Sequence, residues 1–440
     1  MMGIDGVLVQ DLKLVRYPEY KDSGVEWLGE IPVGWEMKQG RRIHQCKKEI
    51  NRQYQESTVL SLTLRGVVNN DLDNPEGLIP RDYKTYQLFN KNDLVFKLID
   101  LENIKTSRVG IVHNNGIMSS AYIRICINQN HYIPKYYYYY YFNLYLLSLY
   151  NKIGAGVRST LNPDDLLEIN VLCFEKREQQ RIAEFLDKKT SQIDQAVAQK
   201  EKMIELLKEY QQVTINNAVT KGLDCNVKLK PSGIDWLGDI PIGWEVKKLK
   251  YCCKINQQCL TETEDYDLLI NYVDISSTNF EQGITKIENY RFKDAPSRAR
   301  RKVKFGDTII STVRTYLKAI DFISGEKSSL IFSTGFAVLS PYVMIYNKFF
   351  NYCIYSDHFI DQINQEATGV SYPAVTADKL IKLCILYPSS LLEQQRIADF
   401  LDKKTSQINE SIKIQQQQIQ KLKEYKATLI NSAVTGKIRI

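Results

Sequence analysis

Two carboxylates and a lysine form the pattern in this chain that most suggests chemistry. Asp164 follows a proline, and Asp187 lies two residues before Lys189. A metal-dependent nuclease needs two carboxylates that converge on a metal ion and a lysine near the attacked phosphate. A second copy of the segment around Asp187 keeps its aspartate and lysine but has Thr-Ala in place of the earlier Pro-Asp. We therefore interpret these residues as solvated helix charges and predict no catalytic residue.

Other patterns for cofactor or metal binding are weak. GAGVRS at 154–159 matches a dinucleotide-binding loop only in its first three residues, and its counterpart ATGVSY at 367–372 lacks the first glycine. Nine cysteines are scattered without Cys-x-x-Cys spacing, and the four histidines lie elsewhere. We expect no metal site and a reducing cytoplasmic location. No Walker loop and no Asn-Pro-Pro-Tyr motif of adenine methylases is present.

Basic side chains lie in two blocks whose sequences differ from one another, residues 40–170 and 249–386. They fit contact with DNA better than catalysis. The net charge of +7 permits nucleic-acid binding without demanding it. Arginine can pair with guanine in the major groove, and lysine or arginine with phosphate. Each residue alone is also explained as an ordinary surface charge, although the RARRK cluster at 298–302 is dense. The DNA-binding candidates are Arg65, Arg81, Lys84, Lys97, Lys105, Arg108, Arg158, Arg291, Lys293, Arg298, Arg300, Arg301, Lys302, Arg314 and Lys318.

The element that must position these candidates is a sequence that occurs twice in the chain and is predicted to be helical. Residues 178–220 and 393–435 align without a gap at an offset of 215, with about 25 of 43 positions identical. Self-similarity over this length predicts a common structural role. Apolar residues recur at heptad spacing in both copies, which indicates a coiled coil. The predicted helix-pairing residues are Ile193, Val197, Ile204, Leu207, Ala218, Ile408, Ile412, Ile419, Leu422, Leu429 and Ala433.

Each copy needs a partner, because a lone helix with so narrow an apolar seam is marginal in water. Two matching seams in one chain favour pairing within the chain. Two unrelated bundle helices, or a seam for another protein, are the alternatives. The Thr-Ser pairs at 190–191 and 405–406 suggest a break into a short and a long helix, the long one spanning roughly 45 Å. Polar residues that interrupt the seam are expected to help set its register: Lys200, Gln211, Gln415 and Lys426.

A second repeat precedes each divergent block. SGVEWLGEIPVGWEMKQ at 23–39 matches SGIDWLGDIPIGWEVKK at 232–248, and these two tryptophan segments hold all four tryptophans. We expect a packed turn in each rather than a ligand site. The blocks that follow, 40–170 and 249–386, contain short β-branched runs separated by turn signals, which predicts mostly β structure. Since this order is repeated, residues 1–22 are expected to meet the C-terminus, as in a ring cut at one junction.

Six consecutive tyrosines at 136–141 follow Pro134 in a predicted helix. Exposed tyrosines can stack on nucleic-acid bases. A helix cannot point six consecutive side chains the same way, so we expect most of them in the core or on ordinary surface. The N-terminus lacks the features of a signal peptide, and no apolar run reaches the roughly 18 residues of a membrane span.

In combination, these motifs resemble the specificity subunit of type I restriction–modification enzymes. The resemblance rests on the paired EQQRIA and FLDKKTSQI helices, the SG-WLG-IP-GWE segments, and the NAVTKG and SAVTGK ends. NDLVFKLIDLENIKTSRVG and GDTIISTVRTYLKA, with SSAYIR and FSTGFAV after them, add weaker support. The similarity covers residues 23–440.

The resemblance implies an α+β fold. Two mixed, β-rich target-recognition domains would be separated by two long antiparallel coiled-coil helices, in a pseudo-two-fold repeat with circular organisation. The expected segments are 1–22 closing the ring, 23–175 and 223–388 for target recognition, and 176–222 and 389–440 for the helical spacers.

The resemblance also implies a non-catalytic subunit that recognises a bipartite, asymmetric double-stranded DNA target. Two adenine methyltransferase subunits and motor-nuclease subunits would be its partners. S-adenosylmethionine, ATP and Mg²⁺ would be cofactors of those partners, with none bound by this chain. A fused restriction–methylation enzyme, and a coiled-coil adaptor that does not bind DNA, are the alternatives.

Overall fold

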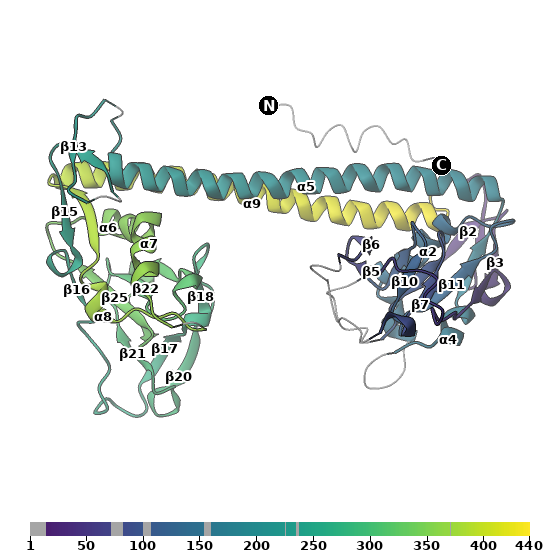
Figure 1. Cartoon of the computed structure of the whole chain (residues 1–440), viewed down its shortest axis with the longest axis horizontal. Helices are drawn as coiled ribbons and strands as arrows, with labels where there is room; N and C mark the ends of the chain where they lie inside the picture. Colours follow the sequence, from purple (N-terminus) through teal and green to yellow (C-terminus); the bar gives the residue numbers. More distant parts are fainter. Residues whose placement is uncertain are drawn as a thin grey trace. The chain divides into compact units, whose positions relative to one another are not determined.

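The computed structural model describes residues 15–71, 82–99, 107–153, 160–224, 226–234, 237–369 and 371–440. The chain divides into two compact units (Figure 1). Unit 1 comprises residues 1–200 and 417–440, and unit 2 comprises residues 201–416. Each unit therefore holds one divergent block, the start of one repeated helix and the end of the other. The predicted segment boundaries stay predictions, because the division runs through both helices.

Unit 1 is built from short antiparallel strands around a four-stranded sheet of order β4-β11-β8-β9. Two-stranded ladders join β1 to β2, β3 to β12, β5 to β6 and β7 to β10. The strands are β1 (Tyr20–Asp22), β2 (Glu30–Pro32), β3 (Glu36–Gln39), β4 (His44–Cys46), β5 (Leu60–Thr63), β6 (Gly66–Asn69), β7 (Gln87–Phe89), β8 (Leu94–Phe96), β9 (Val109–Ile111), β10 (Gly116–Met118), β11 (Ile123–Ile127) and β12 (Asn170–Cys173). The helices are α2 (Pro134–Leu146), α3 (Leu149–Ile153), α4 (Pro163–Glu168) and the start of α5 (Lys176–Lys221).

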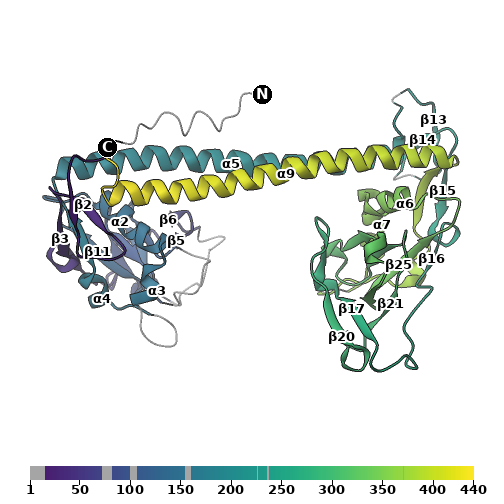
Figure 2. The same ribbon diagram turned by 180° about the vertical axis from the view of Figure 1, so that it is seen from behind.

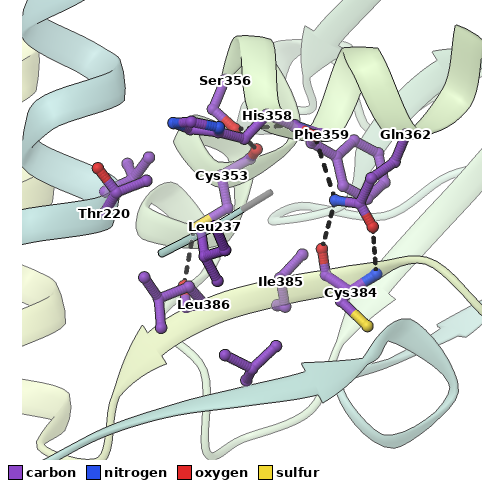
Figure 3. A pocket seen from close by; sticks show the side chains of 12 residues that line it. Thr220, Leu237, Cys353, Ser356, His358, Phe359, Gln362, Cys384, Ile385 and Leu386 are labelled. Carbon is purple, nitrogen blue, oxygen red and sulfur yellow. Dashed lines mark hydrogen bonds between the residues drawn. The ribbon is translucent and has the colours of Figure 1, made fainter. Parts of the chain in front are cut away.

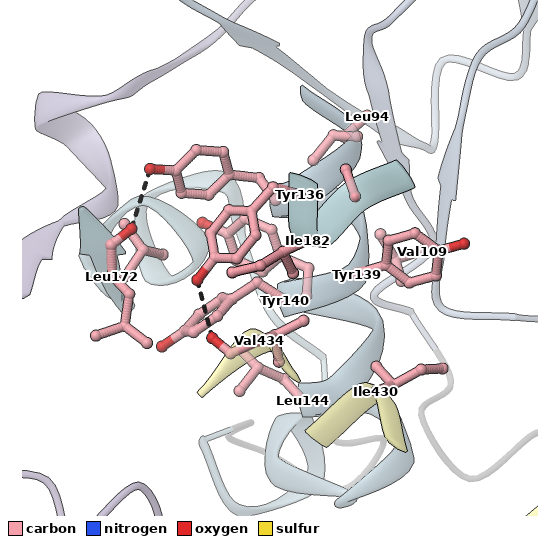
Figure 4. Packing of buried hydrophobic residues seen from close by; sticks show 14 of the residues in the cluster. Leu94, Val109, Tyr136, Tyr139, Tyr140, Leu144, Leu172, Ile182, Ile430 and Val434 are labelled. Atoms are coloured by element: carbon pink, nitrogen blue, oxygen red, sulfur yellow. Dashed lines mark hydrogen bonds between the residues drawn. The ribbon is translucent and has the colours of Figure 1, made fainter. Parts of the chain in front are cut away.

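The tyrosine run forms the core of unit 1, as the sequence predicts. All of its tyrosines except the half-buried Tyr138 are buried. Helix α2 has buried residues around its circumference because β9 contacts it and residues of both long helices belong to the same core. Tyr136 Oη donates to the Val434 carbonyl at 2.9 Å, and Tyr137 Oη donates to that of Leu172 at 3.0 Å (Figure 4). Because the rings of Tyr136 and Tyr137 are fully buried and their hydroxyls bond to backbone carbonyls, neither can stack on bases.

Unit 2 repeats this plan, and it has two four-stranded sheets where the described part of unit 1 has one. Its four-stranded sheets have the orders β16-β25-β22-β23 and β20-β17-β24-β21, and two-stranded ladders join β13 to β14, β15 to β26 and β18 to β19. The strands are β13 (Leu229–Pro231), β14 (Asp239–Pro241), β15 (Trp244–Lys248), β16 (Cys253–Ile255), β17 (Leu269–Val273), β18 (Thr278–Asn279), β19 (Gly283–Ile284), β20 (Glu288–Arg291), β21 (Ala299–Lys302), β22 (Thr308–Ser311), β23 (Ile320–Phe322), β24 (Leu330–Ser333), β25 (Phe336–Pro341) and β26 (Cys384–Pro388). The helices are α6 (Asn347–Tyr355), α7 (Asp357–Glu366), α8 (Ala377–Leu380) and the start of α9 (Leu391–Val434).

Helix α6 occupies the place of α2. Phe349, Phe350, Cys353 and Ile354 are buried at the positions equivalent to the four most deeply buried tyrosines of the run. These four side chains carry no hydroxyl, so they fill by apolar packing the space that tyrosine rings fill in unit 1.

Both long helices are continuous, and the expected break at the Thr-Ser pairs is wrong. Helix α5 runs through 190–191 and α9 through 405–406. Thr405 Oγ1 donates to the Leu401 carbonyl at 2.8 Å, and Thr190 Oγ1 lies 3.1 Å from Tyr139 Oη. A threonine whose hydroxyl bonds to the preceding turn or to a packed tyrosine does not interrupt a helix.

The two helices run antiparallel within each unit (Figure 2). In unit 1, Lys426 Nζ donates to the Asp194 carboxylate at 2.7 Å, and Lys200 Nζ donates to Gln418 Oε1 at 2.5 Å. In unit 2, the Gln211 side chain donates to Asn409 Oδ1 at 3.1 Å. Three of the four polar interruptions therefore reach across to the other helix, and their role in setting register stays a prediction. All predicted helix-pairing residues are buried or half-buried.

The end of each helix packs on the tryptophan segment that follows it in the ring. A Cβ on Gly222 would lie 3.3 Å from Trp244, and one on Gly436 would lie 2.5 Å from Pro32. Val15 forms a β-bridge with Arg439, so the C-terminal residues meet the N-terminal segment as the repeat predicts. Trp35 stacks on Phe174 at 3.7 Å, which fits the predicted packed turn. Trp236 of the second tryptophan segment lies outside the described residues.

Candidate nucleic-acid interface

Of the two carboxylates that imitate a nuclease site, Asp187 connects a long helix to its unit. In unit 1, Asp187 of α5 accepts a hydrogen bond from Tyr139 Oη at 2.6 Å and pairs with Lys135 Nζ at 3.1 Å. The same contacts recur in unit 2, at 2.7 Å and 2.5 Å, among Asp402, Tyr352 and Lys348. Asp164 lies in the first turn of α4, where its backbone N–H donates to the Asn162 cap. Asp187 is thus a partnered helix carboxylate rather than the solvated charge that the sequence suggests.

A buried glutamine repeats the same anchoring role. Gln179 Oε1 accepts the backbone N–H of Ile133 at 3.0 Å, and its amide donates to the Phe174 carbonyl at 2.9 Å. Gln394 accepts from Tyr346 at 2.7 Å and donates to Pro388 at 2.9 Å. Each glutamine satisfies buried backbone groups just before a helix, which fixes α2 or α6 against the start of a long helix.

In the part of the chain that the structure describes, no group of three His, Cys, Asp or Glu residues is arranged to hold a metal ion. Beside the end of α5, a pocket of about 20 Å³ is lined by Thr220, Cys353 and His358 (Figure 3). That volume suffices for about one water molecule. Gln362 also lines the pocket, and its side chain makes two hydrogen bonds to the backbone of Cys384, at 2.8 and 3.0 Å. This pocket cannot hold a nucleotide cofactor.

The basic candidates of unit 1 are dispersed. Arg65 is exposed in the turn between β5 and β6, and Lys84 is exposed before β7. Lys97 is half-buried at the end of β8. Arg108 is only 3% exposed and donates to the Ile99 carbonyl at 3.4 Å, so its described position favours a structural role. Three candidates lie outside the described residues: Arg81, Lys105 and Arg158.

Most basic candidates of unit 2 have acidic or aromatic partners within the unit. Arg291 and Lys293 both pair with Asp267, at 2.9 and 3.0 Å. Lys302 pairs with Glu264 at 2.9 Å. Lys318 lies 3.9 Å from a carboxylate oxygen of Asp357. Ion pairing lowers the charge that these four residues can offer to DNA.

The dense RARRK cluster lies along β21 and is mostly half-buried. Arg300 lies over the Phe292 ring at 4.9 Å, and Arg301 donates to the Cys259 thiol at 3.2 Å. Arg298, at the start of the cluster, keeps 59% of its side chain exposed and lies 3.4 Å from Asp274. The density of basic residues in sequence is therefore a poor guide to their exposure, because alternate residues of a strand point to opposite faces.

Arg314 differs from the other candidates. It is exposed in the loop after β22, and its guanidinium carbon lies 5.0 Å from the centre of the Tyr372 ring. Tyr316 and Tyr372 are 57% and 64% exposed. The sequence interpretation missed both tyrosines, although RTYL sets an arginine beside an aromatic residue. It also missed the buried pair of Arg124 and Asp93 in unit 1, whose side chains meet at 2.6 Å.

No helix in the described ranges is both long enough and apolar enough to cross a membrane. The model of a protein family described as type I restriction modification DNA specificity domain matches residues 43–206 and again residues 241–424. The two matches fall on the two divergent blocks and the helices after them.

A curated relative, the type I restriction enzyme MjaVIII specificity subunit of Methanocaldococcus jannaschii, is 25% identical over 274 residues. The match covers 60% of this chain and 60% of that relative, so this chain spans about three-fifths of the relative's length.

Solved structures share the fold. A chain from work on the structural basis of complex assembly and conformational transition of the type I R-M system has a TM-score of 0.68 at 13% identity. The likeness covers 92% of this chain and 98% of that one. The HsdS subunit from Thermoanaerobacter tengcongensis has a TM-score of 0.50 at 14% identity, covering 93% and 98%.

Proposed function

Because the chain belongs to the type I restriction–modification DNA specificity family, we propose that it is the subunit that selects the DNA sequence on which its partners act. Each unit would read one half of a split, asymmetric target. The subunit itself would catalyse nothing. The partners would be two adenine methyltransferase subunits and motor-nuclease subunits, acting in the cytoplasm with their own S-adenosylmethionine, ATP and Mg²⁺.

One observation carries this proposal: the units repeat their frame but not their exposed surfaces. Asp187 and Asp402 make the same contacts to a tyrosine and a lysine, and Gln179 and Gln394 make the same backbone bonds. The loops that present the basic candidates differ in sequence between the blocks. A constant frame with different surfaces suits a protein that must read two unlike sequences in one assembly.

The antiparallel helices would set the distance between the two half-sites. DNA rises about 34 Å per turn, so reading units held by a rod meet the duplex at a fixed separation. Removing one turn from both helices, at positions opposite one another, should shorten the gap between half-sites without changing either half. Sequencing of methylated adenines in a host that expresses this chain with both kinds of partner subunit would measure the gap, and an unchanged gap would exclude the spacer role.

Exchange of residues 40–170 for the corresponding block of another family member tests the reading role. It should replace only one half of the methylated sequence, because unit 2 is untouched. A change in both halves would contradict separate reading. An assembled complex that binds DNA without any sequence preference would contradict the proposal as a whole and favour an adaptor role.

A stripe on α5 supports partner docking. Its residues follow heptad-like spacing and are all exposed: Met203, Leu206, Tyr210 and Val213. The equivalent positions of α9 are Gln418, Lys421, Tyr425 and Thr428. Leu206→Lys should reduce copurification of a methyltransferase subunit, whereas Lys421→Glu, a charge change at the equivalent place, should affect it less. Equal losses for both variants would argue against docking on the α5 stripe.

A further inference from the structure

We propose that Arg314, held against the ring of Tyr372, reads a guanine in the half-site bound by unit 2. The inference rests on the proposed DNA-binding function and assigns part of it to one side chain. Its starting point is the loop between β22 and β23, where two residues other than glycine adopt left-handed backbone conformations. Arg314 has φ 53° and ψ 52°, and Lys318 has φ 46° and ψ 42°.

Left-handed conformations at such residues cost free energy and persist only where the surroundings hold them. Here the surroundings are a network of backbone bonds. Val313 forms a bridge with Ala374, and Val375 N–H donates to the Thr312 carbonyl at 2.8 Å. On the other side, both the backbone N–H and the hydroxyl of Thr312 donate to the Gly335 carbonyl, at 2.8 and 2.9 Å. The loop is therefore fixed on two sides immediately before Arg314.

The same turn also holds Arg298. The N–H of Thr334 donates to the Arg298 carbonyl at 2.8 Å, one residue before the carbonyl that accepts from Thr312. A side chain on Gly335 would collide with Ile275, because its Cβ would lie 2.3 Å from that residue's Cδ1. The turn thus packs against Ile275. Its backbone bonds hold two separate segments, one with Arg298 and one with Arg314.

Charge and exposure together distinguish Arg314 from its neighbours, because Arg300, which also lies over a ring, is half-buried. Arg291, Lys293 and Lys302 each form an ion pair with a carboxylate at 3.0 Å or less. Within the described residues, Arg314 forms no ion pair, and its recorded partner is the π face of Tyr372. The ring restrains the guanidinium group without neutralising its charge, so the N–H donors remain able to bind DNA.

A guanidinium edge presents two parallel donors that match O6 and N7 of guanine in the major groove. Because the loop and the stacked ring already restrict the side chain, less conformational entropy is lost on binding. A phosphate contact needs no such fixed orientation. The geometry therefore favours a base contact over a backbone contact.

The test uses the full chain assembled with its methyltransferase partners. Arg314→Lys keeps the charge but loses the two-pronged geometry. It should lower methylation about 10- to 100-fold at sites with the preferred guanine and relax the sequence at that single position, leaving the other half-site unchanged. Arg41→Lys is the control, because Arg41 is not among the DNA-binding candidates and its side chain pairs with Glu168 at 2.5 Å; it should leave both the rate and the sequence unchanged.

Replacing each guanine of the wild-type target in turn with 7-deazaguanine, which lacks N7, locates the contact. At one position the substitution should lower the activity of the wild-type complex. The same substitution should not lower the activity of the Arg314→Lys complex any further. Tyr372→Ala should produce a partial form of the same relaxation, and Tyr372→Phe should not, because the ring is retained. Melting temperatures of the variants would show whether they fold.

Two results would overturn the inference while leaving the proposed function intact. One is a folded Arg314→Lys complex that methylates the same sequence at the same rate. The other is an equal loss at all sequences without relaxation at any position, which would make Arg314 a phosphate contact. Failure of the wild-type complex to select any sequence would instead refute the proposed function.

Discussion

The turns before β8 in unit 1 and β22 in unit 2 hold the same carboxylate with different partners. Asp93 Oδ2 accepts the backbone N–H of Asn90 at 2.7 Å, and Asp307 Oδ2 accepts that of Lys304 at 2.9 Å. In unit 1, Arg124 of β11 also donates to Asp93 at 2.6 Å. The equivalent residue of β25 is Val338, which pairs with Ile309 as Arg124 pairs with Val95.

The backbone hydrogen bond to the aspartate is common to both turns, so it shapes the turn. The buried ion pair with Arg124 is a feature of unit 1 that the turn does not require. Burial raises the pKa of Asp307, and its Oδ1 has no hydrogen-bond partner within the described residues. Valine beside Asp307 gives apolar packing and leaves the carboxyl group with hydrogen bonds from Lys304 N–H and Ser340 but without a partner equivalent to Arg124. Buried ion pairs are often replaceable by apolar residues, but not one partner at a time. Substitutions at equivalent positions of the two units test how far the units differ.

Arg124→Val, which introduces the unit 2 residue, should have the largest effect. It leaves Asp93 buried without its partner, and we expect a loss of about 3–5 kcal/mol from the stability of unit 1. Hydrogen exchange of the β8 and β11 amides would measure it, because two units need not unfold in one step. The double variant Arg124→Val, Asp93→Asn should recover most of the loss. No recovery would mean that Arg124 acts through packing alone.

His44→Cys tests the first residue of β4, whose equivalent in β16 is Cys253. Burial lowers the pKa of His44 to about 3, so the folded state resists a proton that the unfolded chain accepts near pH 6.5. Stability should therefore fall as the pH drops below about 6.5, by about 2 kcal/mol at pH 5. The variant should lack this dependence, whatever its stability at pH 8. Identical pH profiles for both proteins would contradict a buried neutral histidine.

Tyr139→Phe and Tyr352→Phe test whether the frame is equivalent in the two units. Each removes a hydroxyl that donates to a helix carboxylate, at 2.6 and 2.7 Å. We expect similar losses of about 1.5 kcal/mol, typical of a hydrogen bond to a charged group. Exchange protection at the starts of α5 and α9 would report them separately. A loss confined to one unit would show that the repeated contacts are not equivalent in strength.

Asp307→Asn should have the smallest effect. Because burial raises the pKa of Asp307, the folded state binds its proton more tightly than the unfolded chain. Wild-type stability from this group should therefore rise as the pH falls through the native pKa, and the variant should lack that rise. At pH 7 the variant should differ by less than about 1 kcal/mol or be slightly more stable. A loss as large as that of Arg124→Val would show that the Asp307 carboxylate has a partner equivalent to Arg124.

The frame could be predicted from the sequence because its signals are local or repeated. The heptad seam from Ile193 onward and the tryptophan segments recur at nearly constant offsets, and the resemblance added the antiparallel arrangement. The predicted break at 190–191 failed because Tyr139 provides a hydrogen-bond partner that the local sequence does not show.

The candidate interface was less predictable, because exposure depends on contacts between distant residues. Arg108 and Arg314 look alike in sequence, yet one is buried and the other is exposed. Tyr372 lies 58 positions from Arg314 in the chain, and backbone contacts such as the bridge between Val313 and Ala374 bring the two together. No periodic pattern encodes such a meeting.

The packing of the helix ends has a consequence for the order in which the chain folds during synthesis. Unit 2 consists of one uninterrupted stretch, residues 201–416. The core of unit 1 includes Leu429, Ile430 and Val434, which are made later. Domains generally fold as units once their residues are available. Synthesis of unit 1 therefore begins first, but its core cannot close around Tyr136 until the end of α9 has been made. Unit 2 can complete its fold before that. During this interval the incomplete unit 1 must be kept from aggregating by chaperones or by its own solubility.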